Sequence, residues 1–146
     1  MFNPFEILHL KQTYSLDQDV LEAHYFEAQR KTHPDQFSRG NEQEKAEAME
    51  KSTAVNQAYL ILRDPLLRAE YLLKMAGIDL LSNDSAFLEH VMEWNERLAR
   101  GEDLHPDLKV KEKELLTGLE NAFFLHDHEM ARRVLYQLTY LQKLLK

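Results

Sequence analysis

The sequence predicts an all-α protein with two parts, an N-terminal antiparallel helical hairpin with flanking short helices and a C-terminal three-helix bundle. The 146 residues include only four Gly and four Pro. The long segments between them carry apolar residues at helical spacing, without the alternation that is typical of strands. The length allows one domain of ordinary size or two small ones, with enough chain to bury a core.

A short helix is predicted at the start of the chain. Asn3, Pro4 and Glu6 have the residue types of an N-cap, a first-turn proline and a capping partner. We expect this helix to end near Leu10.

A long second helix is predicted from just after Asp17 to His33. Four of its residues fall on one helical face, namely Leu21, Tyr25, Ala28 and Thr32. The helix must stop at His33, because the residue before a proline is pushed out of the helical region. A loop should then run to about Gly40.

A third and a fourth helix follow this loop. The third is expected to begin near Asn41, and its inward face should carry Ala48, Ser52, Val55, Tyr59 and Leu62. Asp64 and Pro65 interrupt it. Pro65 suits the first turn of a short helix that ends near Gly77, a residue type favoured at helix C-termini. The apolar residues of this short helix are Leu66, Ala69, Leu72 and Leu73.

The rest of the chain has room for a linker and three more helices. We expect an N-terminal domain at 1–76, a linker at 77–83 and the C-terminal bundle at 84–146. The predicted helices of the bundle are roughly 84–100, 107–125 and 128–145. Their short connections favour packing against one another.

Composition excludes several classes of function. The chain has no Cys, which excludes disulfides, thiolate metal sites and cysteine nucleophiles and is compatible with a reducing compartment. Its net charge of -7 argues against binding to nucleic acid. No apolar run is long enough to cross a membrane, and the N-terminus lacks a signal-peptide pattern. We therefore expect a soluble, cytoplasmic protein.

The tripeptide His-Pro-Asp occurs twice, at 33–35 and at 105–107. The first copy closes one long helix and precedes another, which places it at the exposed tip of a helical hairpin. The second copy lies in a short connection, where Pro106 and Asp107 are residue types that commonly begin a helix. Context therefore favours a binding role for the first copy and a structural role for the second.

The first half of the chain resembles a J-domain. Three segments carry the resemblance: 4–10 resembles the opening helix of that domain, 25–35 its second helix and loop, and 55–71 the end of its third helix with the short fourth one. Among J-domain proteins the chain most resembles the HscB family of iron-sulfur cluster assembly. No glycine-rich linker or cysteine-rich module follows the J-domain. Instead Phe87-Leu88 opens an acidic helix, and 138–144 closes the chain in the manner of that family.

This resemblance implies a co-chaperone that catalyses no reaction of its own and needs no cofactor. Such a protein stimulates the ATPase of an HscA-type heat-shock chaperone and delivers the scaffold protein IscU to it, which aids iron-sulfur cluster maturation. The resemblance assigns chaperone docking to the tripeptide His33, Pro34 and Asp35. Pro34 restricts the loop before binding, and Asp35 can accept charge-assisted hydrogen bonds from an arginine.

J-domains also use a basic face of the second helix to meet an acidic chaperone surface. Arg30 and Lys31 are the expected docking residues here, and a protonated His24 can add to them. Glu22 and Glu27 lie on the same helix and weaken its positive field. We therefore expect modest, salt-sensitive docking to a specialised chaperone.

The C-terminal part carries a second predicted binding surface. In HscB proteins a face of this bundle binds IscU, and the matching residues are Leu88, Met92, Glu93, Glu96 and Tyr140. Leu88 and Met92 lie off the predicted inward stripe of their helix, which consists of Phe87, Val91, Trp94 and Leu98. The predicted inward face of the last helix consists of Met130, Val134, Leu138, Leu141 and Leu145. Apolar residues within a polar rim suit a protein-binding surface. A wider bundle core, or packing on the J-domain, accounts for Leu88, Met92 and Tyr140 equally well.

Other functions remain open at this point. A J-protein of this kind can serve a general DnaK-type chaperone with a different client, or a degenerate J-domain can act only as an adaptor. A metal-dependent hydrolase would need ligands from His33, Asp35, His105, Asp107, His126 and His128. The spacing disfavours it, since none of these residues forms a paired-histidine helical motif and all lie in predicted turns.

Overall fold

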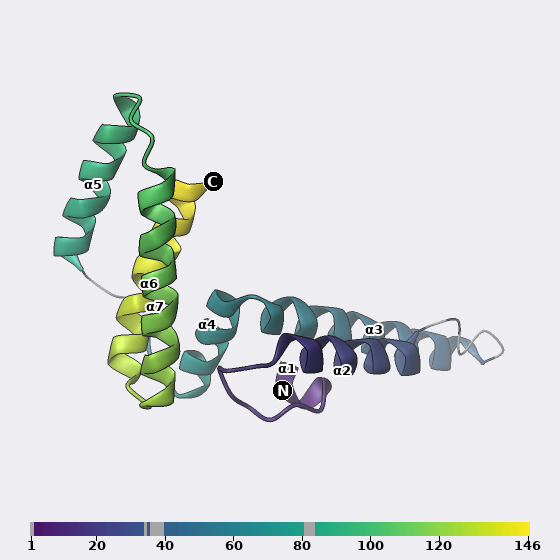
Figure 1. Ribbon diagram of the computed structural model, residues 1–146. Helices are drawn as coiled ribbons and strands as arrows, with labels where there is room; N and C mark the ends of the chain where they lie inside the picture. Colours follow the sequence, from purple (N-terminus) through teal and green to yellow (C-terminus); the bar gives the residue numbers. More distant parts are fainter. Residues whose placement is uncertain (1, 34, 36–39, 81–83) are drawn as a thin grey trace. The chain divides into compact units, whose positions relative to one another are not determined.

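The computed structural model describes residues 2–33, 35, 40–80 and 84–146. Over these residues the chain forms helices and no β-strand, so the predicted all-α class is confirmed (Figure 1). The helices are α1 Pro4–Ile7, α2 Gln18–Thr32, α3 Glu42–Arg63, α4 Pro65–Met75, α5 Ser85–Ala99, α6 His105–Phe124 and α7 His128–Leu145. The chain divides into two compact units, Met1–Arg68 and Ala69–Lys146, which are described separately.

Helix α1 begins as predicted but is shorter. Asn3 Oδ1 accepts hydrogen bonds from the backbone N–H groups of Phe5 at 3.0 Å and Glu6 at 3.3 Å. This satisfies donors that have no partner within the helix. The helix ends at Ile7 instead of near Leu10, because His9 has a φ of 55° in the left-handed region.

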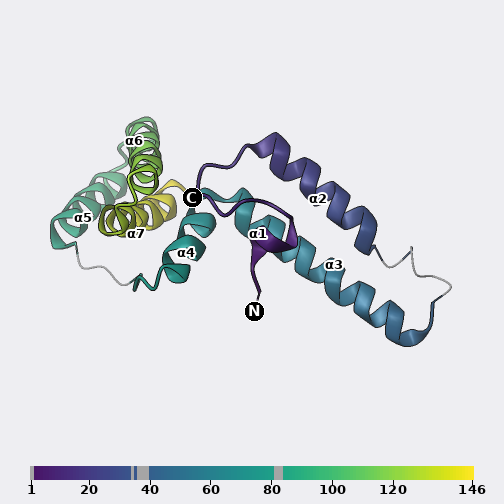
Figure 2. The same cartoon turned by 90° about the horizontal axis from the view of Figure 1, so that it is seen from below.

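Helices α2 and α3 form the predicted antiparallel hairpin, and both views show them side by side (Figures 1 and 2). The inward stripe of α2 is only partly buried: Leu21 is fully enclosed, whereas Tyr25, Ala28 and Thr32 are half-buried. Helix α1 packs on α3. The enclosed side chains of this unit include Phe5, Leu8, Leu21, Val55, Ala58 and Leu62.

One charged residue is part of this core. Arg68 is only 6% exposed, and its Nη1 donates a 2.6 Å hydrogen bond to the carbonyl oxygen of Leu62. Its guanidinium carbon lies 4.7 Å from the centre of the Tyr14 ring. The buried charge is thus stabilised by a carbonyl dipole and an aromatic face.

The short fourth helix ends as the sequence predicts. Gly77 has a φ of 77°, and the backbone N–H of Ile78 donates to the carbonyl of Leu73 at 2.9 Å. This is the left-handed helix ending that glycine favours. Of the predicted linker 77–83, residues 81–83 lie outside the described residues.

In the second unit α6 and α7 lie side by side, and α5 packs against α7. The enclosed stripe of α7 consists of Ala131, Val134, Leu135, Leu138 and Leu141. The prediction that Met130 faces inward is wrong, since this side chain is 44% exposed at the start of the helix. Helix α6 begins at His105, two residues before the predicted position, because Pro106 is accommodated in its first turn.

Helix α5 is covered less completely than its partners. Phe87 and Val91 are buried, but Trp94 and Leu98 are only half-buried.

No helix of the described residues has both the length and the apolar character that crossing a membrane requires.

Candidate functional site

The end of α2 presents the first tripeptide. Helix α2 stops at Thr32, and His33 has the extended backbone of φ -61° and ψ 133° that a following proline favours. Pro34 itself lies outside the described residues. His33 and Asp35 are both exposed, with side-chain accessibilities of 51% and 92%. The tripeptide therefore offers two polar side chains to solvent directly beyond a long helix.

Within the tripeptide, His33 and Asp35 contact each other. The backbone N–H of Asp35 donates to Nδ1 of His33 at 3.2 Å, and the Asp35 carboxylate lies 3.5 Å from the same nitrogen. The first contact requires an unprotonated Nδ1, and the second becomes an ion pair when the ring is protonated. Either contact ties the imidazole to the backbone turn. The Asp35 carboxylate remains mostly in solvent, where it can accept hydrogen bonds from a partner.

A hollow of about 530 Å³ adjoins the tripeptide, lined by Phe26, Gln29, Arg30, His33 and Asp35. Phe26 is 61% exposed. The sequence interpretation missed Phe26 and Gln29. The sequence did contain a signal for Phe26, because it is an aromatic residue outside the inward stripe of α2 and close to the basic residues of that helix. Exposed aromatic rings are common anchors in protein interfaces.

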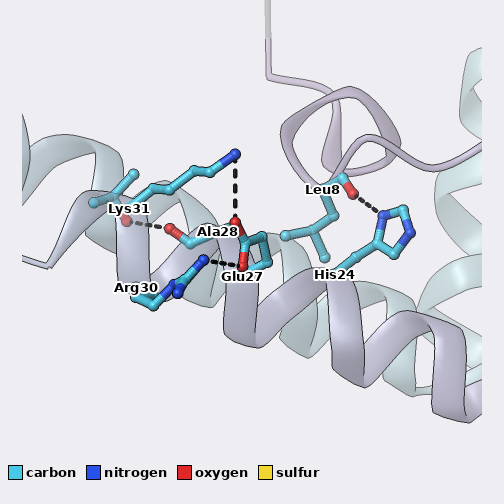
Figure 3. A network of polar contacts seen from close by, with 7 residues as sticks. Leu8, His24, Glu27, Ala28, Arg30 and Lys31 are labelled. Atoms are coloured by element: carbon cyan, nitrogen blue, oxygen red, sulfur yellow. Dashed lines mark hydrogen bonds and ion pairs between the residues drawn. The ribbon is translucent and has the colours of Figure 1, made fainter.

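The two basic residues predicted for docking both pair with Glu27 (Figure 3). Arg30 Nη2 lies 2.6 Å from Glu27 Oε2, and Lys31 Nζ lies 3.5 Å from Glu27 Oε1. The hydrogen bond from Arg30 lowers the pKa of Glu27, and the charges of Arg30 and Lys31 act in the same direction. The carboxylate is therefore ionised at neutral pH and offsets much of the positive charge of this turn.

His24 makes a contact that the sequence did not predict. Its Nδ1 lies 2.7 Å from the carbonyl oxygen of Leu8, so this nitrogen carries a proton and donates it (Figure 3). The side chain is half-buried in a groove between α1 and α2. This contact joins α1 and α2 on the N-terminal side of the turn of α2 that carries Arg30 and Lys31. The loop after the tripeptide carries a further basic residue, Arg39, which lies outside the described residues, as does Gln36.

The second predicted surface lies on α5 and α7. Met92 is 63% exposed, Leu88 is half-buried, and Glu93 and Glu96 are exposed beside them. Tyr140 is half-buried on α7. On α5, Leu88 and Met92 thus form an apolar spot beside Glu93 and Glu96, which is the composition expected of a small binding patch.

Contacts within α7 hold Tyr140 in place. Its ring centre lies 5.0 Å from that of Tyr136, and Nζ of Lys143 lies 5.1 Å above the Tyr140 ring. Burial raises the pKa of Tyr136, and the Tyr140 hydroxyl adds to this effect. Helix α5 is joined to α7 by a 2.9 Å hydrogen bond from Gln137 Nε2 to Asp84 Oδ2.

The second tripeptide begins a helix. His105 opens α6, Pro106 lies in its first turn, and Asp103 Oδ1 accepts the backbone N–H of His105 at 3.2 Å. This arrangement is ordinary N-terminal capping. Within the part of the chain that the structure describes, no three His, Asp or Glu side chains come together in a group able to hold a metal ion.

Comparisons with known proteins cover both halves of the chain. The family model "DnaJ domain" matches residues 3–71, and "HSCB C-terminal oligomerisation domain" matches residues 83–146. The crystal structure of the human co-chaperone protein HscB superposes with a TM-score of 0.91 at 33% sequence identity, over 97% of this chain and 78% of that one. The chain belongs to the HscB family of J-domain co-chaperones.

Two curated members of the HscB family are similar in sequence. The iron-sulfur cluster co-chaperone protein HscB of Mus musculus is 35% identical over 93% of this chain and 63% of its own length. The co-chaperone protein HscB homolog of Burkholderia thailandensis is 41% identical over 64% of this chain and 57% of its own length. The chain thus spans about three fifths of the length of these two HscB proteins.

The resemblance read from the tripeptide and its flanking segments is confirmed. The first tripeptide lies inside the J-domain match, and Leu88, Met92 and Tyr140 lie inside the match to the HscB C-terminal domain. The J-domain match therefore includes the end of α2, where His33 and Asp35 are exposed.

Proposed function

We propose that this chain stimulates the ATPase of an HscA-type heat-shock chaperone and delivers the iron-sulfur scaffold protein IscU to it. In this proposal it aids iron-sulfur cluster maturation as a co-chaperone and catalyses no reaction itself. Membership of the HscB family supports the proposal, and so does the name of the mouse relative, an iron-sulfur cluster co-chaperone.

One observation carries the chaperone half of the proposal. His33 and Asp35 are exposed directly beyond α2, inside the J-domain match, with Arg30 lining the same hollow. We assign docking to His33, Pro34, Asp35, Arg30 and Lys31. The Asp35 carboxylate would accept charge-assisted hydrogen bonds from an arginine of the chaperone, while the two cations would face its acidic surface.

The scaffold half rests on the C-terminal unit. We assign IscU binding to Leu88, Met92, Glu93, Glu96 and Tyr140. Met92 supplies exposed apolar area, and the neighbouring carboxylates would favour a partner whose apolar residues are flanked by basic ones. This charge complementarity also agrees with the net charge of -7 of the whole chain.

These assignments divide the chain by role. We propose that residues 1–76 act as the J-domain, that 77–83 serve as a linker, and that 84–146 form the scaffold-binding bundle. We propose further that the protein works in the cytoplasm. The absence of Cys is compatible with this reducing compartment, in which disulfides are rare.

The test is steady-state ATP hydrolysis by a purified HscA-type chaperone, measured with and without IscU. The native chain should stimulate hydrolysis, IscU should increase the stimulation further, and His33→Gln should abolish it. His105→Gln is the matched control, because it makes the same exchange in the second tripeptide, at the start of α6.

Other results would contradict the proposal in different ways. Stimulation that does not depend on His33 would remove the tripeptide mechanism, and stimulation indifferent to IscU would remove the proposed client. Equal stimulation of a DnaK-type chaperone across a salt series would favour a general J-protein with a different client.

A further inference from the structure

We propose that Glu27 sets the strength and selectivity of chaperone docking, because it holds Arg30 and Lys31 in internal ion pairs that a partner must displace. The inference rests on the proposed docking of α2 to an acidic chaperone surface. It adds a residue that would not touch the chaperone and would act through its two neighbours.

The geometry allows a single carboxylate to occupy both cations. The two oxygens of Glu27 are used separately, Oε2 by Arg30 and Oε1 by Lys31 (Figure 3). The spacings are i,i+3 and i,i+4 with the acid on the N-terminal side, which is the favourable order on a helix. Figure 3 shows both side chains turned toward Glu27 along the surface of α2.

These pairs compete directly with a partner. Arg30 lines the hollow beside His33 and Asp35, so it is next to the tripeptide that the chaperone would contact. Lys31 lines the groove between α1 and α2 together with Glu27. On its other side Lys31 borders a groove that also contains Glu44 and Glu47. An approaching chaperone carboxylate therefore meets cations that already have an anionic neighbour.

The pairs are weak enough to be displaced. The side chains of Arg30, Lys31 and Glu27 are 69%, 68% and 47% exposed, and exposed ion pairs contribute little to stability. A chaperone that places a carboxylate for a two-point contact with Arg30 gains more than Glu27 offers. A partner surface with only a diffuse negative potential would gain almost no binding free energy by displacing Glu27. Glu27 thus raises the interaction free energy that an acidic partner must supply in order to bind Arg30 and Lys31. This requirement is a source of selectivity.

The experiment measures the Kd of the full chain for an HscA-type chaperone across a salt series. Glu27→Gln should bind about two- to fivefold more tightly than the native chain at low salt, the gain expected for releasing a pair of this class. The gain should shrink as salt screens the charges. Glu22→Gln is the matched control, because it makes the same change in net charge on another side of α2.

A second arm separates pairing from overall charge. In a chain that already carries Arg30→Gln and Lys31→Gln, adding Glu27→Gln should bring no gain, because the partners of Glu27 are absent. Amide hydrogen exchange of α2 in each variant verifies that the helix remains folded.

Three results would overturn the inference: a gain in Glu22→Gln equal to that in Glu27→Gln, a gain that persists without the two cations, or weaker binding by Glu27→Gln. The last result would mean that Glu27 positions the cations for the chaperone. Failure of the proposed function looks different, since the native chain would then bind without dependence on His33. Where binding does depend on His33, the Glu27 variants decide the inference by themselves.

Discussion

The rings of Tyr25 and Tyr59 stack, with centroids 4.1 Å apart and planes 10° from parallel. The Tyr25 hydroxyl donates to Asn56 Oδ1 at 2.9 Å and accepts from Gln29 Nε2 at 3.2 Å. These contacts join α2 to α3 about two helical turns before His33. They lie where the apolar stripe of α2 is only half-buried, so this aromatic pair adds to the contacts that the enclosed Leu21 makes nearer the start of α2.

Replacing Tyr25 with Ala should loosen the hairpin. The change removes the stack and the hydrogen bond to Asn56, and we expect the free energy of unfolding of the N-terminal unit to fall by about 2 kcal/mol. Hydrogen exchange of the α2 and α3 amides should report the loss. Tyr25→Phe is the control: it keeps the stacked ring and should cost less than about 1 kcal/mol. Equal protection in the native chain and Tyr25→Ala would contradict this role.

Arg68 should tolerate substitution poorly, even by lysine. A lysine loses the planar guanidinium that lies against the Tyr14 ring and donates to the Leu62 carbonyl. We expect Arg68→Lys to lower the unfolding free energy by about 1–3 kcal/mol, the range for leaving a buried polar group poorly satisfied. Urea unfolding followed by far-UV circular dichroism measures it. Arg63→Lys changes an exposed arginine near Tyr59 and should be nearly neutral; similar losses in both variants would contradict the prediction.

Asp84 should make the stability of the C-terminal unit depend on pH. It caps α5 by accepting the N–H of Phe87 at 3.1 Å. The hydrogen bond from Gln137 lowers the pKa of Asp84, and the bond from the Phe87 backbone lowers it further. A lowered folded-state pKa means that the ionised carboxylate stabilises the fold above its ordinary pKa of 3.8. This contribution is lost as the pH falls through the folded-state value.

Two variants test this cap. Asp84→Ala should cost about 1 kcal/mol at pH 7, as expected for a lost N-cap. Asp84→Asn should keep most of the capping and lose the acid dependence. Fluorescence of Trp94, the single tryptophan of the chain, reports on α5 during unfolding at pH 7 and at about pH 3. A native chain whose acid response matches that of Asp84→Asn would contradict the assignment.

Much of the fold was predictable from the sequence because local signals decide it. The caps at Asn3 and Gly77 and the stop before Pro34 each act within a few residues, and the helical spacing of apolar residues identifies the long helices. The errors fall where tertiary packing decides. Met130 has the spacing of a core residue, yet it lies in the first turn of α7, where its side chain is exposed.

The sequence was enough to predict which residues belong to the candidate sites, but it did not predict the contacts between them. The sequence placed Arg30, Lys31 and Glu27 on the same helix, but only the folded structure shows that the carboxylate of Glu27 pairs with both cations. The burial of Arg68 was equally hidden, because a charged residue is usually exposed unless a specific partner stabilises it. Leu88 and Met92 both lie off the predicted inward stripe of α5, yet Met92 is exposed and Leu88 is half-buried. The sequence pattern alone does not predict this difference.

This difference in exposure makes the proposed scaffold-binding patch testable. Met92→Ala should leave stability within about 0.5 kcal/mol of the native value, since an exposed side chain loses few contacts. It should weaken IscU binding by about tenfold if Met92 anchors the partner, which corresponds to about 1.4 kcal/mol. Leu88→Ala, at a half-buried position, should lose both binding and stability. Isothermal titration with IscU and thermal unfolding of each variant provide the two readouts.

Met130→Ala is the matched control, because Met130 is also exposed, belongs to the same unit and lies outside the proposed patch. It should leave both stability and IscU affinity unchanged. If Met92→Ala binds IscU as tightly as Met130→Ala does, the apolar spot on α5 is not the scaffold-binding anchor. If Met92→Ala instead destabilises the bundle as much as Leu88→Ala does, both residues act in the core. An intermediate loss of affinity confined to Met92→Ala would place this methionine at the rim of the interface, where partial solvent access limits what one side chain contributes.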